Sequence, residues 1–248
     1  MGNEFLLFGE RCSGTNVVQS LVEQNFNMKV SWHLGYKHWP DININWDEVD
    51  LPIVLVTRNP FSYFSSLYRK PWHAPEEIRK LEFSDFLRSE WWNVYNEEVR
   101  VSPGDDRYGK EMPREFFHEE GRRFRNVVEM RSVRLRQLAE IYNSRAKKVV
   151  VVDFEELRSD QDSVVHRISR SWNISPVYSR VRSVRDYKGS ASWKRQAFNL
   201  VTFGCFRRKS VGRDIAYDKS DVEFIIQNLD VQVEAFFGYR PWVFTCSV

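Results

Sequence analysis

The stretch FLLFGERCSGTNVV, residues 5–18, indicates the fold class of this chain. Its apolar run 5–8 predicts a buried strand, and the small and polar residues around Gly14 predict a tight loop. Apolar side chains then recur at helical spacing, at Val17, Val18, Leu21, Val22 and Phe26. A strand, a tight loop and a helix in this order are typical of α/β proteins.

Two further apolar runs, residues 53–57 and 149–154, predict buried strands. They are rich in β-branched residues and do not alternate with polar ones, which is typical of parallel strands covered on both faces. Because a helical pattern follows each run, we expect an α/β fold. The chain is predicted to be a single domain over residues 1–248, with a central parallel β-sheet flanked by helices.

Two more helices are predicted farther along the chain. Apolar spacing places one of them over residues 126–142. The other begins at a cap, Ser220 or Asp221, and runs to Phe237, where Gly238 ends it.

Residues 70–125 combine many aromatic, proline and charged residues. We expect an irregular insertion that lines a pocket, rather than a separate domain. Its tryptophans Trp72, Trp91 and Trp92 belong either to the core or to a surface that stacks on a sugar or an aromatic ligand.

The composition restricts the class of protein. Of the 248 residues 42% are hydrophobic, which is enough to bury a sizeable core. No apolar run approaches the roughly 20 residues that span a bilayer, and no leader-like segment precedes the first strand. The three cysteines, Cys12, Cys205 and Cys246, have no metal-binding spacing. We therefore expect a cytoplasmic protein without a membrane partner.

The net charge is only +3, but arginine and lysine cluster at residues 121–137 and 205–209. Such clusters suit phosphate, sulfate or nucleic acid. A solvated helix face is the alternative. It is the interpretation that we favour for Arg131 and Arg134, which lie three residues apart on one helical face.

The loop after the first strand is a candidate anion site. A helix N-terminus offers unpaired N–H groups and a partial positive charge, Gly14 lets the backbone approach a ligand, and neighbouring side chains add donors. An ATP-binding loop of the type G-x-x-x-x-G-K-[ST] has a lysine after its second glycine. Here Thr15 follows Gly14, and Arg11 is the only nearby cation. A capped helix without a ligand explains the same residues.

A second anion contact is predicted from VTRNPFSYFSSLYR, residues 56–69. Arg58 stands at the end of a strand, and Ser66 lies eight residues later on the following helix. Because strand ends of parallel sheets open onto the ligand crevice, these two side chains can grip one phosphate from two sides. A structural ion pair of Arg58 is the alternative.

Between the two anion elements lies GYKHWP, residues 35–40, which contains Lys37 and His38. A histidine in this place is a candidate general base. His33 is the rival base, and simple packing beside Trp39 is the alternative role for His38.

With these motifs in this order, the chain resembles the sulfotransferases that use 3′-phosphoadenosine 5′-phosphosulfate (PAPS) and release PAP. Arg58 and Ser66 match the pair that holds the 3′-phosphate in that family, and Lys37-His38-Trp39-Pro40 is similar to its K-T-H-x-P motif with the catalytic histidine. The family's first loop, K-S-G-T-T or R-S-G-T, holds the 5′-phosphosulfate. The matching residues here are Cys12, Ser13, Gly14, Thr15 and Asn16.

The resemblance extends from Phe5 to Tyr239 and implies a P-loop NTPase-like sulfotransferase fold. The segment DYKGSASWKR, residues 186–195, is similar to the family's R-K-G followed by W-K. This similarity implies that Lys188 and Gly189 help to hold the 3′-phosphate.

The chain departs from the family at Cys12, where the family has lysine or arginine. That cation bridges the transferring sulfuryl group and the leaving phosphate. We expect Arg11 to take this role, with Lys37 as the substitute if Arg11 points elsewhere.

The resemblance implies sulfuryl transfer from PAPS to a hydroxyl or amine of a small-molecule or glycan acceptor, without a metal. His38 would take the acceptor proton, and residues 70–125 would line the acceptor pocket. No nucleic-acid partner is expected. Two alternatives remain: a P-loop phosphotransferase that uses a nucleoside triphosphate, and a non-catalytic module that binds an anion or nucleic acid.

Overall fold

A computed structural model gives the structure of the chain and describes residues 3–40, 43–113, 120–144, 148–184, 215 and 217–240. Its centre is a four-stranded sheet of order β2-β1-β5-β6, in which all neighbours are parallel. The strands are β1 (Glu4–Gly9), β2 (Lys29–Val30), β5 (Ile53–Thr57) and β6 (Val149–Asp153). The predicted α/β class and parallel sheet are confirmed.

The sheet differs from the prediction in two details. The edge strand β2 was not predicted, because two residues are too few to show a hydrophobic pattern. The third predicted strand ends one residue earlier, at Asp153, since the carboxylate of Asp153 caps α6 (Phe154–Ser159) by accepting from Glu156 N.

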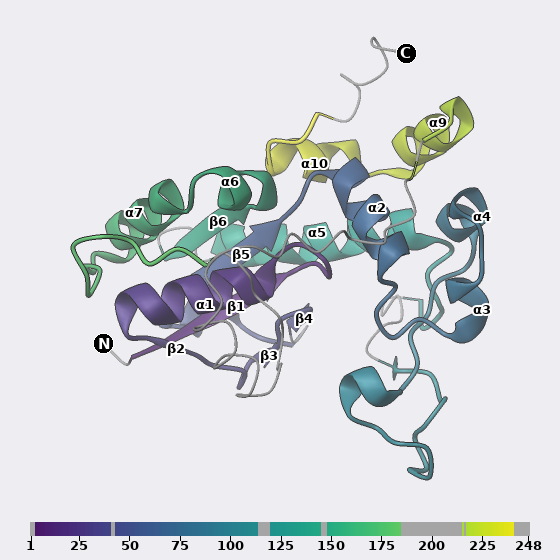
Figure 1. Ribbon diagram of the computed structural model, residues 1–248, viewed down its shortest axis with the longest axis horizontal. Helices are drawn as coiled ribbons and strands as arrows, with labels where there is room; N and C mark the ends of the chain where they lie inside the picture. The colour runs from purple at the N-terminus through teal and green to yellow at the C-terminus, as the bar shows by residue number, and fades with distance from the viewer. Residues whose placement is uncertain are drawn as a thin grey trace, which may run out of the picture.

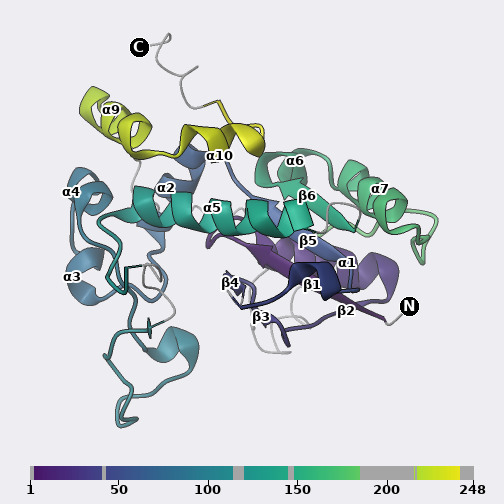
Figure 2. The ribbon, with the colours of Figure 1, turned by 180° about the vertical axis from the view of Figure 1, so that it is seen from behind.

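Helices cover both faces of the sheet. Alternate residues of β1, Phe5 and Leu7, pack with α1 (Thr15–Phe26), α6 and α7 (Gln161–Trp172) in one core cluster. The intervening residues, Leu6 and Phe8, pack on the other face with α5 (Val127–Ser144) and α10 (Val231–Phe236). Figure 1 shows α1 in front of the sheet, and Figure 2 shows α5 lying across the face behind it.

A third apolar cluster lies at the side of the molecule away from α7 (Figure 1). It joins α2 (Pro60–Arg69), α4 (Phe83–Arg88) and the first turn of α5 with α9 (Lys219–Asn228). The predicted insertion 70–125 contributes to it and also holds α3 (Glu76–Arg79) and the 3-10 helix η2 (Glu97–Val99). Between these short helices its described part is irregular, as expected.

The sequence predicted one C-terminal helix, but the structure has two, α9 and α10, so the prediction of a continuous helix was wrong. Asp230 lies at the break and caps α10, where its side chain accepts from Gln232 N at 3.1 Å and Val233 N at 3.2 Å. Asp218 rather than Ser220 or Asp221 caps α9, accepting from Asp221 N at 2.7 Å. A capping carboxylate competes with a continuous helix, and apolar spacing alone does not show this competition.

Smaller elements complete the described chain. The hairpin strands β3 (Gly35–Tyr36) and β4 (Trp39–Pro40) pair antiparallel, and η1 (Trp46–Glu48) packs near Phe8. None of the helices in the ranges that the structure describes is both long and apolar enough to cross a membrane.

Gly14 fits the turn before α1 for two reasons. Its φ is +91°, and a Cβ at this position would lie 2.7 Å from Cδ2 of Phe154 on α6. We expect Gly14→Ala to lower the free energy of unfolding by about 2–4 kcal/mol, from the left-handed backbone and the overpacking together. Denaturant titration measures this loss.

Gly109→Ala is the matched control, because Gly109 has φ +75° and open space where a Cβ would lie. Its free energy of unfolding should fall only by the cost of the left-handed backbone, about 1–2 kcal/mol. Equal losses in the two variants would contradict the contact with Phe154.

Candidate functional site

The carboxyl ends of the three central strands meet at one edge of the sheet, where ligands bind in open α/β sheets. β1 ends at Gly9 and leads into the loop 10–14, β5 is followed by Arg58, and β6 ends at Asp153. The side chains singled out from the sequence, apart from those outside the described residues, therefore gather at this edge or beside it.

The loop 10–14 curls tightly in front of α1. Cys12 and Gly14 both have left-handed backbones, with φ of +59° and +91°. The Ser13 hydroxyl donates to Glu10 O at 2.6 Å, and no side chain caps α1. Since the hydroxyl hydrogen of Ser13 is used inside the loop, backbone N–H groups at the start of α1 are the donors left for an anion.

Of the two cations proposed to replace the missing lysine, Lys37 contacts the first turn of α1, and the side chain of Arg11, a loop residue, turns away from that helix. The ammonium group of Lys37 donates to Asn16 Oδ1, and its side chain is buried. Burial lowers the pKa of Lys37 to about 8, so it is largely charged at neutral pH. Arg11 lies over the Trp39 ring at 4.9 Å and donates from Nη1 to Trp72 O at 3.1 Å. Lys37 is thus the cation nearest the N-terminus of α1.

Arg58 links the two predicted anion motifs. Its Nη1 donates to Cys12 O at 2.6 Å, and its guanidinium group lies 4.0 Å from the centre of the Phe154 ring. Ser66 lies beside the Cys12 thiol, which donates to Lys70 O at 3.9 Å, and burial raises the pKa of this thiol to about 11. Arg58 and Ser66 therefore both lie at the loop, which they reach from the end of β5 and from α2, and Cys12 stays a neutral thiol. Their grip on one phosphate from two sides stays a prediction.

Arg58 also has an acidic neighbour. Its Nε donates to Ser62 Oγ at 2.9 Å, and Ser62 donates in turn to Glu155 Oε1 at 2.5 Å. Glu155 itself lies 4.0 Å from Arg58 and is well exposed. At 4.0 Å this pair has no direct hydrogen bond, so the guanidinium group reaches Glu155 only through Ser62.

His38 stands in the β3–β4 turn and reaches the end of β1. Its Nδ1 lies 2.8 Å from Gly9 O, and Gly9 N donates to Lys37 O at 2.8 Å. Burial and the charges of Lys37 and Arg11 hold the pKa of His38 well below the ordinary value, so the ring is neutral. The rival His33 is exposed and pairs with Ser31 Oγ, away from the loop.

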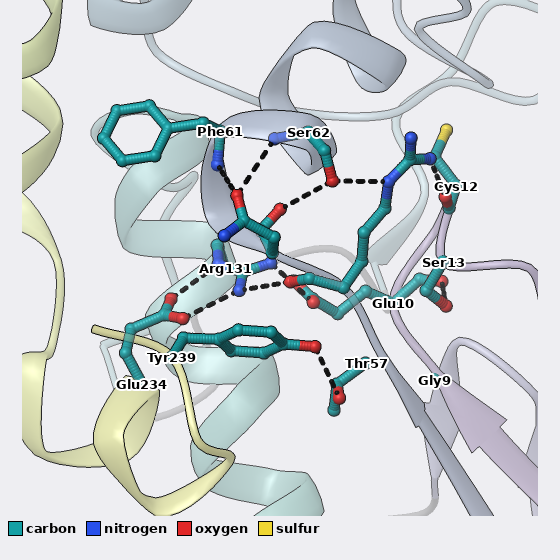
Figure 3. A network of polar contacts seen from close by, with 12 residues as sticks. Gly9, Glu10, Cys12, Ser13, Thr57, Phe61, Ser62, Arg131, Glu234 and Tyr239 are labelled. Carbon is teal, nitrogen blue, oxygen red and sulfur yellow. Dashed lines mark hydrogen bonds and ion pairs between the residues drawn. The ribbon is translucent and has the colours of Figure 1, made fainter. Parts of the chain in front are cut away.

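Arg131 is the residue of this region whose surroundings were predicted wrongly from the sequence. Its side chain is fully buried, and Arg134 is buried as well, so the predicted solvent-exposed stripe does not exist. Figure 3 shows the Arg131 guanidinium between two carboxylates: Nη1 donates to Glu10 Oε2 at 2.7 Å, and Nε donates to Glu234 Oε1 at 2.6 Å. Nη2 donates to Arg58 O at 2.8 Å.

Glu10 is the least satisfied member of this network. Its Oε1 is buried and accepts no hydrogen bond, and desolvation raises the pKa of Glu10 against the attraction of Arg131. The carboxylates of Glu10 and Glu234 come from segments more than 200 residues apart in the chain, so no local pattern could pair them. The sequence offered one indication that Arg131 is buried: it stands among the apolar positions of the α5 pattern.

Tyr239 contacts the ends of the strands β5 and β6. Its hydroxyl lies 2.5 Å from Asp153 Oδ2 and 2.9 Å from Thr57 Oγ1, and burial raises its pKa (Figure 3). The end of the described chain is thereby fixed to the ends of β5 and β6.

An open cavity of about 650 Å³ lies beside the loop and the Arg58–Phe154 pair. Val17 of α1, Phe154 and Leu157 of α6 provide apolar walls. Arg158, Asp160, Gln161, Asp162, Ser159, Ser183 and Val184 complete the lining. A flat ring with polar edges fits such a mixed wall.

The other predicted residues take ordinary places or lie outside the described residues. Lys188 and Gly189, like the basic segment 205–209, belong to the second group. Trp91 belongs to the core, Trp72 is partly exposed, and Trp92 lies under the Arg123 guanidinium at 4.0 Å.

The basic run 121–125 is neutralised by acidic partners, since Arg122 and Arg125 pair with Glu129 and Arg123 pairs with Glu90 and Glu111. Within the described ranges no group of three or more His, Cys, Asp or Glu side chains is placed to hold a metal ion.

No protein-family model, no curated protein and no solved structure matches this chain. The family, the ligand and the reaction are therefore inferred from the residues and contacts described above.

The Arg131 network gives a stability prediction. Arg131→Met leaves Glu10 and Glu234 buried without a counter-charge, so we expect the free energy of unfolding to fall by about 3–5 kcal/mol. Adding Glu10→Gln and Glu234→Gln removes both unpaired charges and should recover part of this loss. Denaturant titration of the two variants checks the difference.

Arg136→Met on the same helix is the control, because Arg136 is half exposed and lies 3.8 Å from Asp230. It should change stability by less than about 1 kcal/mol. If the variant with Arg131→Met, Glu10→Gln and Glu234→Gln together is no more stable than Arg131→Met alone, the shape of the Arg131 side chain, and not its charge, stabilises the fold.

Proposed function

We propose that this chain is a PAPS-dependent sulfotransferase with a P-loop NTPase-like sulfotransferase fold. The observation that carries the proposal is the convergence of Arg58 and Ser66 on the loop 10–14 at the carboxyl edge of a parallel sheet. Two separate anion-binding elements side by side suit a ligand with two phosphate-type groups at its ends.

The 5′-phosphosulfate binds at the loop and the N-terminus of α1. The donors are the N–H groups of the uncapped first turn, which also carries the positive end of the helix dipole. Lys37 adds a full positive charge at Asn16. This arrangement assigns to Lys37 the charge that a loop lysine supplies elsewhere, and it leaves Arg11 on the Trp72 side of the site.

The 3′-phosphate binds at Arg58 and Ser66. A guanidinium group has five N–H donors, and the contacts to Cys12 O and Ser62 Oγ use two of them. The remaining donors suit a bidentate contact with a phosphate. The adenine ring then enters the cavity walled by Val17, Phe154 and Leu157, next to Gly14.

Sulfuryl transfer follows from this placement. The acceptor atom attacks sulfur, the bond from sulfur to the bridging oxygen breaks, and its electron pair leaves with PAP. Lys37 and the α1 N–H groups stabilise the charge that develops on the bridging oxygen. His38 takes a proton from the acceptor, because Nδ1–H donates to Gly9 O and the neutral ring keeps its lone pair on Nε2.

The ligand gives the first prediction from this proposal. PAP should raise the melting temperature much more than AMP at equal concentration, because only PAP has the 3′-phosphate. Arg58→Ala should remove most of the difference, at a loss of about 2–4 kcal/mol of PAP binding. Thermal shift and calorimetry measure both effects.

Arg69→Ala is the matched control, since Arg69 is an exposed arginine on α2, the helix that follows Arg58. ATP and an oligonucleotide belong in the same series, because they are the ligands of the two alternative functions. Equal shifts with PAP and AMP would contradict a PAPS site, and a larger shift with ATP or the oligonucleotide would favour an alternative.

The pKa of Lys37 gives the second prediction. Because the protonated form attracts the 5′-phosphate and the pKa is about 8, PAP affinity should fall as the pH rises through about 8. The loss of one charge-assisted contact corresponds to about 1.5–3 kcal/mol.

Lys37→Arg should keep its affinity over the same pH interval, since a guanidinium group stays charged. Calorimetry at several pH values compares the two proteins. The same pH dependence in both would assign the titration to another group.

A further inference from the structure

Arg158 of α6 is a second arginine beside the Phe154 ring, and no sequence motif pointed to it. Its guanidinium carbon lies 6.0 Å from the centre of this ring, and that of Arg58 lies 4.0 Å from the same centre. The two guanidinium groups therefore cannot be farther apart than the sum of these distances. The Arg158 side chain is exposed and free to adjust, whereas that of Arg58 is largely buried.

Phe154 connects this pair of arginines to the anion loop. A Cβ on Gly14 would lie 2.7 Å from Cδ2 of Phe154, so the ring packs against the turn before α1. The same ring, together with Val17 and Arg158, lines the cavity of about 650 Å³ in which we place the adenine ring. Arg158 thus shares a wall with the proposed cofactor site.

The charge of Arg158 is not compensated by the residues that the structure describes. None of their carboxylates forms an ion pair with it. By contrast, Arg167, the next arginine along the chain, pairs with Glu156 at 2.6 Å. An uncompensated guanidinium group at the wall of a cavity is available to an anionic ligand.

Two carboxylates also line this cavity. Asp160 caps α7, where it accepts from Ser163 N at 2.9 Å, and Asp162 lies in the first turn of that helix. Carboxylate oxygens accept from the exocyclic amino group of adenine but repel a phosphate group. A phosphate group therefore belongs at the Phe154 ring, with the two arginines.

The two arginines repel each other as long as no anion lies between them. Burial lowers the pKa of Arg58, and the positive charge of Arg158 acts in the same direction. An anion that binds both guanidinium groups turns this repulsion into two attractions.

The charge of a phosphate monoester also calls for two cations. Its second pKa is about 6, so it carries close to two negative charges at neutral pH. Arg58 supplies one positive charge, and the hydroxyl group of Ser66 supplies none. A second guanidinium group balances the charge and adds donors in the fork geometry that suits phosphate oxygens.

We propose that Arg158 binds the 3′-phosphate of PAPS together with Arg58, so that the phosphate lies between the two guanidinium groups at the Phe154 ring. This inference rests on the proposed sulfotransferase function and adds a specificity-determining residue to the same site. The family resemblance implied such a role for Lys188 and Gly189, and not for a residue of α6.

This placement separates PAP from AMP. Arg58 follows β5 and Arg158 lies on the helix after β6, so a phosphate between them joins the ends of two neighbouring strands. AMP has no group at this position and leaves the two positive charges uncompensated. The contribution of Arg158 is therefore expected for PAP alone.

The test measures the binding of PAP and of AMP by calorimetry. Arg158→Gln keeps a polar side chain but removes the charge. We expect its PAP affinity to fall by about 10–100-fold, the loss typical of one charge-assisted contact, with its AMP affinity unchanged. Arg158→Lys keeps the charge but not the fork of donors, so its PAP affinity should be intermediate.

Two further variants complete the series. Arg170→Gln is the matched control, because Arg170 is an exposed arginine on the neighbouring helix α7, and its PAP affinity should be unchanged. Lys188→Gln tests the assignment that the family resemblance implied. A loss of PAP affinity in Lys188→Gln without a loss in Arg158→Gln would overturn the assignment to Arg158.

A purely structural role of Arg158 has a different signature. The residue lies in the last turn of α6, where a positive charge stabilises a helix. Loss of that effect would lower the melting temperature without ligand and would weaken PAP and AMP binding equally. We expect the ligand-free melting temperature of Arg158→Gln to change by no more than about 2 °C.

The outcomes separate the two levels of inference. Absence of PAP binding to the parent protein would overturn the proposed function and the role of Arg158 together. PAP binding with the full PAP–AMP difference kept in Arg158→Gln, or with an equal loss for both ligands, would overturn the role of Arg158 alone.

Discussion

Arg131 places one fully buried positive charge between the carboxylates of Glu10 and Glu234 and beside the carbonyl oxygen of Arg58. The cost of burying these ions is offset only because each lies within hydrogen-bond distance of a partner. This single guanidinium group therefore fixes the start of the anion loop, the end of β5 and the helix α10 relative to one another. The anion loop and Arg58, two of the ligand contacts that we propose, belong to these segments.

The network also explains how the loop works without its own lysine. The side chains of the loop are already engaged, since Ser13 donates to Glu10 O, Arg11 donates to Trp72 O, and the neutral Cys12 thiol lies beside Ser66 of α2. Positive charge comes instead from other segments, namely Lys37 at Asn16 and Arg58 at Cys12 O. The loop then provides shape and backbone donors, while neighbouring segments provide the charge.

The insertion 70–125 is joined to the anion loop by hydrogen bonds. Its first residues attach to the anion loop through the contact of Arg11 with Trp72 O, and Asn93 Nδ2 donates to the same oxygen at 2.8 Å. These contacts hold His73 in its left-handed conformation close to the loop, with Glu98 behind it.

Local patterns were enough to predict the strands β1, β5 and β6 and the helix after each. These features depend on hydrophobic periodicity and on the rule that parallel strand ends share one edge. Three other features emerged only from the folded chain: which cation reaches the loop, the burial of Arg131, and the hold of Glu98 on His73. Each of these depends on contacts between segments far apart in the chain, and spacing along a sequence carries no information about which distant charges become neighbours.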